Sequence, residues 1–369
     1  MMHTTKIGRF DVLPFRTPTQ QKILHTIWVK SRTTQSEISA ILEVDKSTVS
    51  RNLSPLLKEG IVEKVAEIDP GPSGGRKADV FSINDSWKYF IGIGIEQGEI
   101  FGVLTNFAGK SVASTSKMIN IDAENIVDVI SEVVEDFMEM NNNILGIALG
   151  VPGVVDNEAG VIILSESLGL RDFPLEEVLE RRFRKKCYIE NDSNAAVARC
   201  FSRPMFYGMN VLYFLLSLPF DLSNYVGLGV GIAIDGEIYR GSNLLSGETP
   251  LKVALMKKKM TLPEFEKSPP SDVDYSGFIK KASEVIATIV NVMDPSVAII
   301  GGDVNLFPDS LLNDLMDSIK SKIFMADSKK LELRYDHDGL KTMALGSVRA
   351  FLTRFMKDFE FSKKVFSIG

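Results

Sequence analysis

Cysteine and histidine are scarce in this chain of 369 residues, which contains two cysteines and three histidines. Two cysteines cannot form a disulfide framework and are typical of a protein kept in a reducing cytoplasm. The histidines, His3, His25 and His337, are too few and too scattered for a histidine-based metal site. No apolar run approaches the roughly 20 residues of a membrane span, and Met1 to Phe10 lacks the apolar core of a signal peptide. We therefore expect a cytoplasmic protein that contacts no membrane.

Charge is distributed unevenly along the chain. The net charge is −6, yet residues 1–88 carry 13 Lys and Arg against 10 Asp and Glu, so the acidic excess lies in residues 89–369. A basic segment joined to an acidic one indicates two modules, and the length suggests two or three domains. With 44% hydrophobic and 24% charged residues, the composition is that of a folded globular protein rather than a disordered one.

The first 88 residues have the pattern of a winged helix-turn-helix. The expected elements are helices over 18–31, after Thr33-Thr34 and after Asp45, a helix-ending Gly60, strands at 61–65 and 80–83, and a polar loop at 70–77. Asp45 is a good N-cap, and glycine commonly follows the last helical turn. Three helices followed by a two-stranded wing favour DNA binding, although a small helical domain used for protein contacts remains the alternative.

The third helix would be the recognition helix, which places its N-terminal residues against base edges in the major groove. The candidate DNA contacts are Lys46, Ser47, Thr48, Ser50 and Arg51 in this helix, and Arg76 and Lys77 in the wing. Arginine can bind guanine through two hydrogen bonds, and hydroxyls suit phosphates or bases. Pro55 removes one backbone hydrogen bond inside the helix, so we expect a kink or break that confines DNA reading to Lys46–Ser54.

Strands followed by helices occur twice after Phe90. Strands are expected at 90–95, 101–106, 111–117, 145–151, 186–189, 210–217, 226–234 and 297–300, and helices at 124–140 and 278–293. This repetition predicts two related α/β lobes with a cleft between them. Cys187 and Cys200 fall in this region and are interpreted as buried thiols.

Several short motifs, taken in order, resemble the ROK family, which contains sugar kinases and sugar-responsive repressors. The matching segments are 73–76, 149–156, 190–196, 235–236 with 240–241, 247–248, and 294–295 with 301–302. The resemblance covers nearly the whole chain and favours the transcriptional-regulator branch of the family. It implies an α/β fold in which a winged helix-turn-helix at 1–88 precedes a two-lobed, actin-like (ribonuclease H-like) sugar kinase body. The lobes would be 89–200, completed by the C-terminal helix, and 201–369.

Both phosphate loops that the resemblance implies are altered here. The family's Asp-x-Gly-Gly-Thr is Glu96-Gln97-Gly98-Glu99-Ile100 in this sequence, and its Gly-Thr-Gly is Gly227-Leu228-Gly229. Glu99 brings a negative charge toward a bound phosphate, and two like charges about 4 Å apart repel by about 1–4 kcal/mol. Ile100 and Leu228 cannot supply the missing hydroxyls. ATP is therefore not expected to bind, and no enzymatic activity is expected.

The sugar-binding residues implied by the resemblance match better. Asn191 and Asp192 match the family's sugar-binding pair, and Glu248 and Gly153 complete the set. Asp192 would be the catalytic base only if kinase activity is retained, and its alternative role is to cap the helix that follows. Leu251 replaces a family histidine, so the sugar should differ from glucose or be larger than a monosaccharide. Residues 252–275 contain no Cys or His, so neither the family's zinc nor another cofactor is expected.

These features predict a sugar-responsive transcriptional regulator, acting as a repressor of carbohydrate-utilisation genes, with a degenerate kinase body. Its partners would be double-stranded operator DNA, a sugar or oligosaccharide effector, and further copies of itself in a homodimer or tetramer. A head with a net charge of only +3 should bind DNA tightly only when heads are paired. The alternatives are an ATP-dependent sugar kinase of the glucose or N-acetylglucosamine type carrying a DNA-binding head, and a DNA-binding protein whose body only dimerises.

Overall fold

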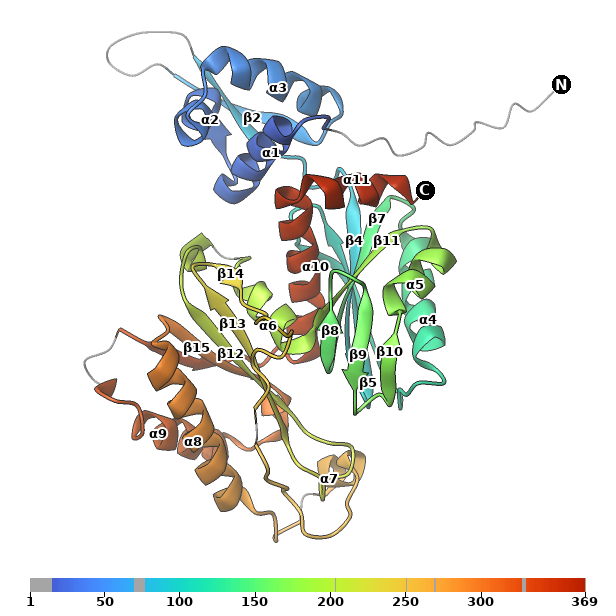
Figure 1. The fold of residues 1–369 in the computed structure, drawn as a ribbon, viewed down its shortest axis with the longest axis vertical. Coiled ribbons are helices and arrows are strands. Elements are labelled where there is room, and N and C mark those ends of the chain that lie inside the picture. The colour runs from blue at the N-terminus through green and yellow to red at the C-terminus, as the bar shows by residue number, and fades with distance from the viewer. Residues whose placement is uncertain are drawn as a thin grey trace, which may run out of the picture.

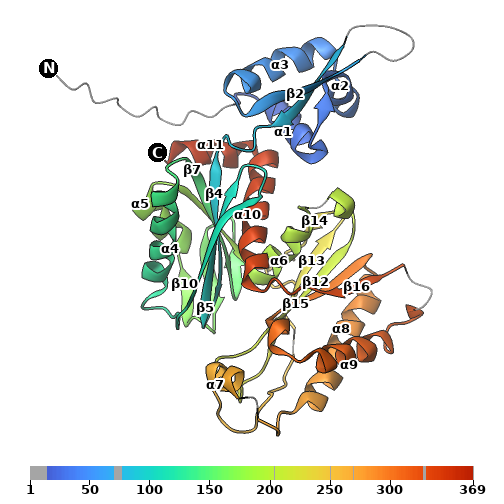
Figure 2. The ribbon, with the colours of Figure 1, turned by 180° about the vertical axis from the view of Figure 1, so that it is seen from behind.

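The chain folds into a head and a body of two lobes (Figure 1). This computed structural model describes residues 15–69, 77–202, 204–249, 251–268, 270–326 and 330–368. The head lies beside the end of the first lobe where the C-terminal helices pack, and the second lobe extends away from it (Figures 1 and 2). No helix in the described ranges combines the length and apolarity needed to cross a membrane. The predicted order of a winged helix-turn-helix followed by a two-lobed α/β body is confirmed.

The head contains the predicted three helices and a wing. Its elements are α1 (Pro18–Lys30), β1 (Thr33–Thr34), α2 (Gln35–Leu42), α3 (Lys46–Lys58), β2 (Val62–Ile68) and β3 (Ala78–Ile83). Asp45 caps α3 by accepting the N–H of Thr48, and Gly60 follows the helix with a positive φ of 72°, as predicted. Of the kink or break expected at Pro55, the break does not occur, because α3 runs through this residue to Lys58. Only one backbone hydrogen bond is lost, and the carbonyl of Pro55 still accepts the N–H of Glu59.

The first lobe is a five-stranded sheet in the order β11-β7-β4-β5-β6. Its elements are β4 (Tyr89–Glu96), β5 (Glu99–Asn106), β6 (Ser111–Met118), α4 (Ile126–Met140), β7 (Ile144–Val151), α5 (Leu175–Phe183) and β11 (Lys186–Asn191), with a small sheet of β8 (Val154–Asp156), β9 (Val161–Ser165) and β10 (Leu170–Phe173). β4, β7 and β11 are parallel. Helices α4 and α5 share a hydrophobic core with one face of the sheet, and the C-terminal α10 (Leu340–Lys357) packs against the other.

The second lobe repeats this plan with a five-stranded sheet in the order β14-β13-β12-β15-β16. Its elements are η1 (Pro204–Phe206), β12 (Val211–Ser217), β13 (Gly227–Ile234), β14 (Glu237–Ile238), α7 (Leu262–Lys267), α8 (Tyr275–Met293), β15 (Val297–Gly302), η2 (Asp303–Leu306), α9 (Asp309–Lys320) and β16 (Glu332–Tyr335). α8 and α9 cover one face of this sheet with a single hydrophobic core. The opposite face packs against α6 (Asp192–Cys200), which lies between the lobes.

Helix α6 is held closely on both sides by glycines. A Cβ added to Gly231 of β13 would lie 2.0 Å from the carbonyl oxygen of Ser193. A Cβ added to Gly346 of α10 would lie 1.8 Å from the carbonyl oxygen of Ala195. Real Cβ atoms do not approach that closely, so both positions require glycine. The backbone of α6 is therefore in direct contact with β13 on one side and with α10 on the other.

The head is packed against the body rather than joined only by a linker. The buried ring of Phe15 contacts Phe355 of α10 at a centroid distance of 5.6 Å. Gln21 of α1 donates hydrogen bonds to the carbonyl of Phe355 (2.8 Å) and to the Ser362 hydroxyl of α11 (Phe359–Ser367; 3.1 Å). One hydrophobic core continues from the head into α10 and α11. The orientation of α1 is therefore fixed by α10 and α11.

Candidate functional site

A cavity of about 1370 Å³ lies between the two lobes. Its walls come from the β4–β5 hairpin, the start of α6, the loops around β13, and the segment before α10. All nine residues predicted for the sugar site and the two phosphate loops line it: Glu96, Gly98, Glu99, Gly153, Asn191, Asp192, Gly227, Gly229 and Glu248. Residues up to 152 positions apart in the sequence are thus brought to one cavity, whereas their binding roles stay predictions.

Asn191 shapes the cavity through bonds within the chain. Its side-chain oxygen caps α6 by accepting the N–H of Asn194 (3.0 Å) and also accepts the Ser193 hydroxyl (2.7 Å). Its Nδ2 donates to the carbonyl of Gly153 over 2.9 Å, which ties the turn after β7 to the start of α6. The helix cap is therefore Asn191, and the alternative that Asp192 serves as the cap is wrong.

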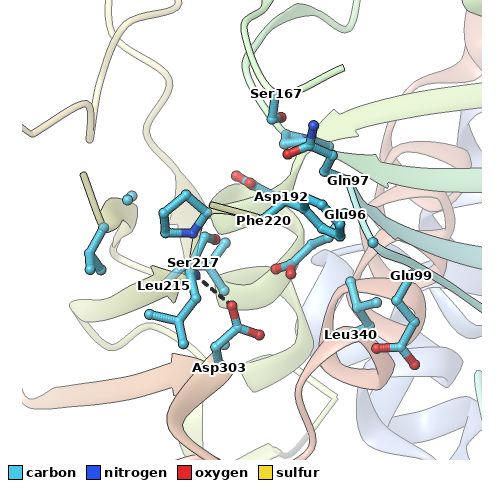
Figure 3. A pocket seen from close by; sticks show the side chains of 18 of the residues that line it. Glu96, Gln97, Glu99, Ser167, Asp192, Leu215, Ser217, Phe220, Asp303 and Leu340 are labelled. Atoms are coloured by element: carbon cyan, nitrogen blue, oxygen red, sulfur yellow. Dashed lines mark hydrogen bonds between the residues drawn. The ribbon is translucent and has the colours of Figure 1, made fainter. Parts of the chain in front are cut away.

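Asp192 is the first residue of α6, and its side chain lies in the cavity near Glu96 (Figure 3). Its Oδ1 accepts the N–H of Ser193 over 2.6 Å. Burial raises the pKa of Asp192 to about 7; the hydrogen bond from Ser193 opposes this effect, and the charge of Glu248 adds to it. A carboxyl group with this pKa is partly protonated near neutral pH, so it can accept a hydrogen bond from a sugar hydroxyl or donate one to it.

Carboxyl groups also gather where the two altered phosphate loops meet. Asp303 follows β15, and its Oδ2 accepts the N–H of Leu218 over 2.6 Å (Figure 3). Burial raises the pKa of Asp303 to about 7, and burial with the charge of Asp303 raises the pKa of Glu96 well above its usual value. Burial also raises the pKa of Glu99. This end of the cavity therefore disfavours each additional negative charge.

Basic side chains are nearly missing from the cavity wall. Among the described residues that line it, Lys341 is the only Lys or Arg, and its Nζ lies 3.2 Å from a carboxylate oxygen of Asp338. A kinase needs cationic groups or a metal to offset the charge of a transferring phosphate. No group of three or more His, Cys, Asp or Glu in the described ranges is arranged to hold a metal ion. The wall thus offers little to offset the charge of a triphosphate.

Part of the cavity wall is apolar. Leu251, which takes the place of the family's histidine, is buried and lines the cavity. The rings of Phe220 and Tyr225 also line it, and Tyr225 is 60% exposed. Burial raises the pKa of Glu248, and the charge of Glu166 adds to this. A wall that combines carboxyl and amide groups with apolar and aromatic groups suits an uncharged sugar, which has polar hydroxyls and apolar C–H faces.

Sequence reasoning missed a buried ion pair that joins the lobes. Glu190, at the end of β11, is 1% exposed and accepts hydrogen bonds from Arg240, which follows β14 in the second lobe. The Nη2–Oε2 distance is 2.6 Å, and the Tyr188 hydroxyl donates to the same oxygen over 2.8 Å. Both residues lie in segments that matched the family motifs, but no role was assigned to them. A glutamate at the end of an otherwise apolar strand was the available signal.

The head presents most of its predicted DNA contacts to solvent. Lys46, Ser47, Ser50 and Arg51 are exposed on α3, and Thr48 is half-buried. The Ser47 and Thr48 hydroxyls both donate to the Asp45 carboxylate, so they are left as hydrogen-bond acceptors toward DNA.

The wing contributes one described candidate. Lys77 is exposed, and its Nζ lies 2.9 Å from a carboxylate oxygen of Asp69. Arg76 lies outside the described residues, as does the rest of the segment 73–76. An exposed ion pair of this kind contributes little to stability, so DNA phosphates can compete for Lys77.

Comparison with known proteins gives two family matches. Residues 90–250 match the ROK family, and residues 16–63 match a winged helix-turn-helix DNA-binding domain. A candidate xylose repressor of Caldicellulosiruptor sp. (strain Rt8B.4) is 31% identical over 61% of this chain and 56% of that protein. The xylose repressor of Caldicellulosiruptor bescii is 24% identical over 88% of this chain and 93% of that protein. The chain thus spans just over half of the first relative and nearly all of the second.

The fold is also found in a solved structure. The crystal structure of a ROK family transcriptional regulator, described as a homologue of the Escherichia coli Mlc protein, aligns with a TM-score of 0.72 at 15% identity. The alignment covers 95% of this chain and 100% of that one. At this level of identity the likeness is one of fold, and it includes both the head and the two lobes.

Proposed function

This chain belongs to the ROK family and carries a winged helix-turn-helix, and from this premise we propose that it is a sugar-responsive transcriptional repressor with a non-catalytic kinase-like body. One observation carries the proposal. The interlobe cavity has hydrogen-bonding groups suited to a sugar at Asn191 and Asp192, but carboxylates where a kinase would hold phosphates. A sugar sensor needs groups that bind the sugar, but it needs no groups that hold phosphates.

Electrostatics argue against phosphoryl transfer. Glu99 and Asp303 line the end of the cavity formed by the two altered loops, and Lys341 is already paired with Asp338. Repulsion between an ionised carboxylate and a phosphate oxygen about 4 Å away costs about 1–4 kcal/mol, and a carboxyl group that stays protonated supplies no positive charge to offset the phosphates. Kinases rely on positioning and charge neutralisation at this point. Loss of both explains a body that binds a ligand without transferring phosphate.

The same charges select the effector. A sugar phosphate would meet the same repulsion, so we propose an uncharged sugar. Because two aligned relatives are named as xylose repressors, xylose is the first candidate, and larger uncharged sugars follow. Binding would fix the two lobes against each other and change the orientation of the head, which α1 joins to α10. In a homodimer or tetramer, such a change alters the half-site spacing that two heads can span.

The proposal is tested on DNA fragments that the full-length protein selects from a random library. Mobility shifts are measured with xylose, glucose and xylo-oligosaccharides, using wild-type protein, Asp192→Asn and the surface control Asp136→Asn. We expect one sugar to change the DNA affinity by about tenfold or more, with the response lost in Asp192→Asn and retained in Asp136→Asn. DNA binding that responds to no sugar in the panel would refute the sensor function.

The kinase alternative has a separate test. ADP release is measured with Mg-ATP and the same sugars in a coupled assay. We expect no turnover above background, because the cavity wall repels the nucleotide. Sugar-dependent ADP release that disappears in Asp192→Ala would overturn the non-catalytic assignment. If calorimetry detects no sugar binding while DNA binding persists, the body serves only in dimerisation.

A further inference from the structure

A second cavity, of about 420 Å³, lies where the head meets both lobes. Its wall includes Trp28 of α1, Arg349 of α10 and Gly236 in the turn between β13 and β14. Tyr207, from the loop before β12, completes this side. The three parts of the molecule thus share one cavity, which is separate from the sugar cavity and which the proposed function does not use.

Arg349 is unlike the other cations on this wall. Its guanidinium group stacks on the Trp28 ring at 3.8 Å from the centroid and donates one hydrogen bond to the Tyr207 hydroxyl over 3.2 Å. Its Nε is buried and donates to no oxygen within the described part of the chain. In the same part of the chain, no carboxylate lies within ion-pair distance of Arg349. Burial lowers the pKa of Arg349, which expresses the cost of an enclosed cation.

The remaining cations around this cavity already have anionic partners. Arg354 pairs with Glu158, Lys357 pairs with Glu237, and Arg240 pairs with Glu190. His25, from α1, adds no further positive charge. Burial first, then the charges of Lys357 and Arg349, lower its pKa to about 4, so it is neutral at pH 7. Asp235 and Asp358 also line the cavity, but among the described residues no carboxylate pairs with Arg349, which is thus the cation of this wall left without a counter-ion.

We propose that this cavity binds a small metabolite carrying a phosphate or carboxylate group, and that the anionic group pairs with the outer nitrogens of Arg349. The volume lies within the range of small-molecule sites and is large enough for a sugar phosphate or a tricarboxylate. Arginine binds both anion types through paired hydrogen bonds. The Trp28 and Tyr207 rings supply the apolar walls such a molecule needs. The sugar cavity, lined by carboxylates, selects an uncharged ligand, whereas this cavity selects an anion.

Such a ligand would act on the head directly. It would contact α1 through Trp28 and α10 through Arg349, and so hold or shift the junction that sets the orientation of α3. The cavity would then be a second effector site, and the observations that support it do not depend on whether the first cavity binds a sugar. The two proposals can therefore fail separately.

Tryptophan fluorescence tests the proposal, because the chain contains only Trp28 and Trp87. Trp87 packs against Phe107, away from this cavity, and Trp87→Phe leaves Trp28 as the only reporter. This variant of the full chain is titrated with inorganic phosphate, citrate and glucose 6-phosphate, each against sodium chloride of equal ionic strength and against glucose. We expect a saturable change in Trp28 emission, and in its quenching by acrylamide, with at least one anion. The phosphate and citrate arms distinguish the two anion classes.

Two further variants locate the binding. Arg349→Gln in the same background should weaken the apparent affinity by about tenfold or more, since it removes a charged hydrogen-bond donor. Lys258→Gln, at an exposed position of the second lobe, should leave the Trp28 response unchanged. If sodium chloride of equal ionic strength changes the Trp28 emission as much as the anions do, the proposal is overturned, whatever the further variants show. An equal anion response in Arg349→Gln would also overturn it, because the anion would then bind elsewhere.

Discussion

The ion pair between Glu190 and Arg240 should be among the most sensitive contacts between the lobes. Arg240→Met keeps much of the side-chain volume but leaves Glu190, which is 1% exposed, without its cation. Burying a carboxylate without a counter-ion costs far more than losing an exposed pair, because water cannot replace the missing partner. The substitution therefore tests whether this pair holds the two lobes in the arrangement that forms the sugar cavity.

The magnitude follows from the partners that remain. Removing one member of a buried ion pair costs about 3–5 kcal/mol. Glu190 would still accept hydrogen bonds from the Tyr188 hydroxyl (2.8 Å) and from Nδ2 of Asn194 (3.3 Å), which reduces the loss. We expect the free energy of unfolding to fall by about 2–4 kcal/mol. At about 2 cal/mol/K of unfolding entropy per residue, this corresponds to a fall in Tm of roughly 3–7 °C for the body.

Differential scanning calorimetry measures the shift, with Lys357→Met as the matched control. Lys357 pairs with Glu237 at the protein surface, where the side chains are 42% and 65% exposed, so its loss should cost less than about 1 kcal/mol. Glu190→Gln combined with Arg240→Met should recover part of the lost stability, because the uncompensated charge is gone. If Arg240→Met changes Tm no more than Lys357→Met does, the reasoning about buried charge at this position is wrong.

Three further predictions concern the cavity and the head. Burial raises the pKa of Asp192 to about 7, so this carboxyl favours the folded state at low pH and that contribution is lost as pH rises from about 4 to 7. Asp192→Asn should therefore raise Tm at pH 8 but change it little at pH 4, and equal shifts at both pH values would contradict this. Arg51→Gln should weaken binding to selected DNA by about tenfold in mobility shifts, whereas the body variant Lys258→Gln should not. Mg-ATP should shift Tm in a thermal melt by less than about 1 °C, and a larger, saturable shift would show that the altered loops still bind nucleotide.

The sequence predicted the elements whose pattern is local. Helix α3 begins after Asp45 and is followed by Gly60 because a capping carboxylate and a flexible glycine act over a few residues. The break expected at Pro55 did not occur. The lost hydrogen bond is a local cost, but Val49, Leu53 and Leu56 are buried on the same helix and stabilise its continuation to Lys58. Tertiary packing thus outweighed a local preference that the sequence alone suggested.

The sequence predicted which residues line the candidate site, but not their hydrogen bonds or their pKa values. Motif order was sufficient to name Asn191 and Asp192, yet it could not show that Asn191 caps α6 and ties down Gly153. The elevated pKa values of Asp192 and Asp303 arise from burial between two lobes, which no linear pattern encodes. The second cavity was missed for the same reason, since its walls come from the head and both lobes.

The close glycine contacts on both sides of α6 have a further consequence for how two ligands would influence each other. This helix of nine residues is about 13 Å long, begins at the sugar cavity with Asp192 and reaches the second cavity at Ala198. Its backbone lies directly against Gly231 of β13 and Gly346 of α10, so a displacement of the helix would press on an element of each lobe. An uncharged sugar at one end and an anion at the other would then both contact α6. Whatever factor the anion imposes on sugar affinity, the sugar must impose on anion affinity.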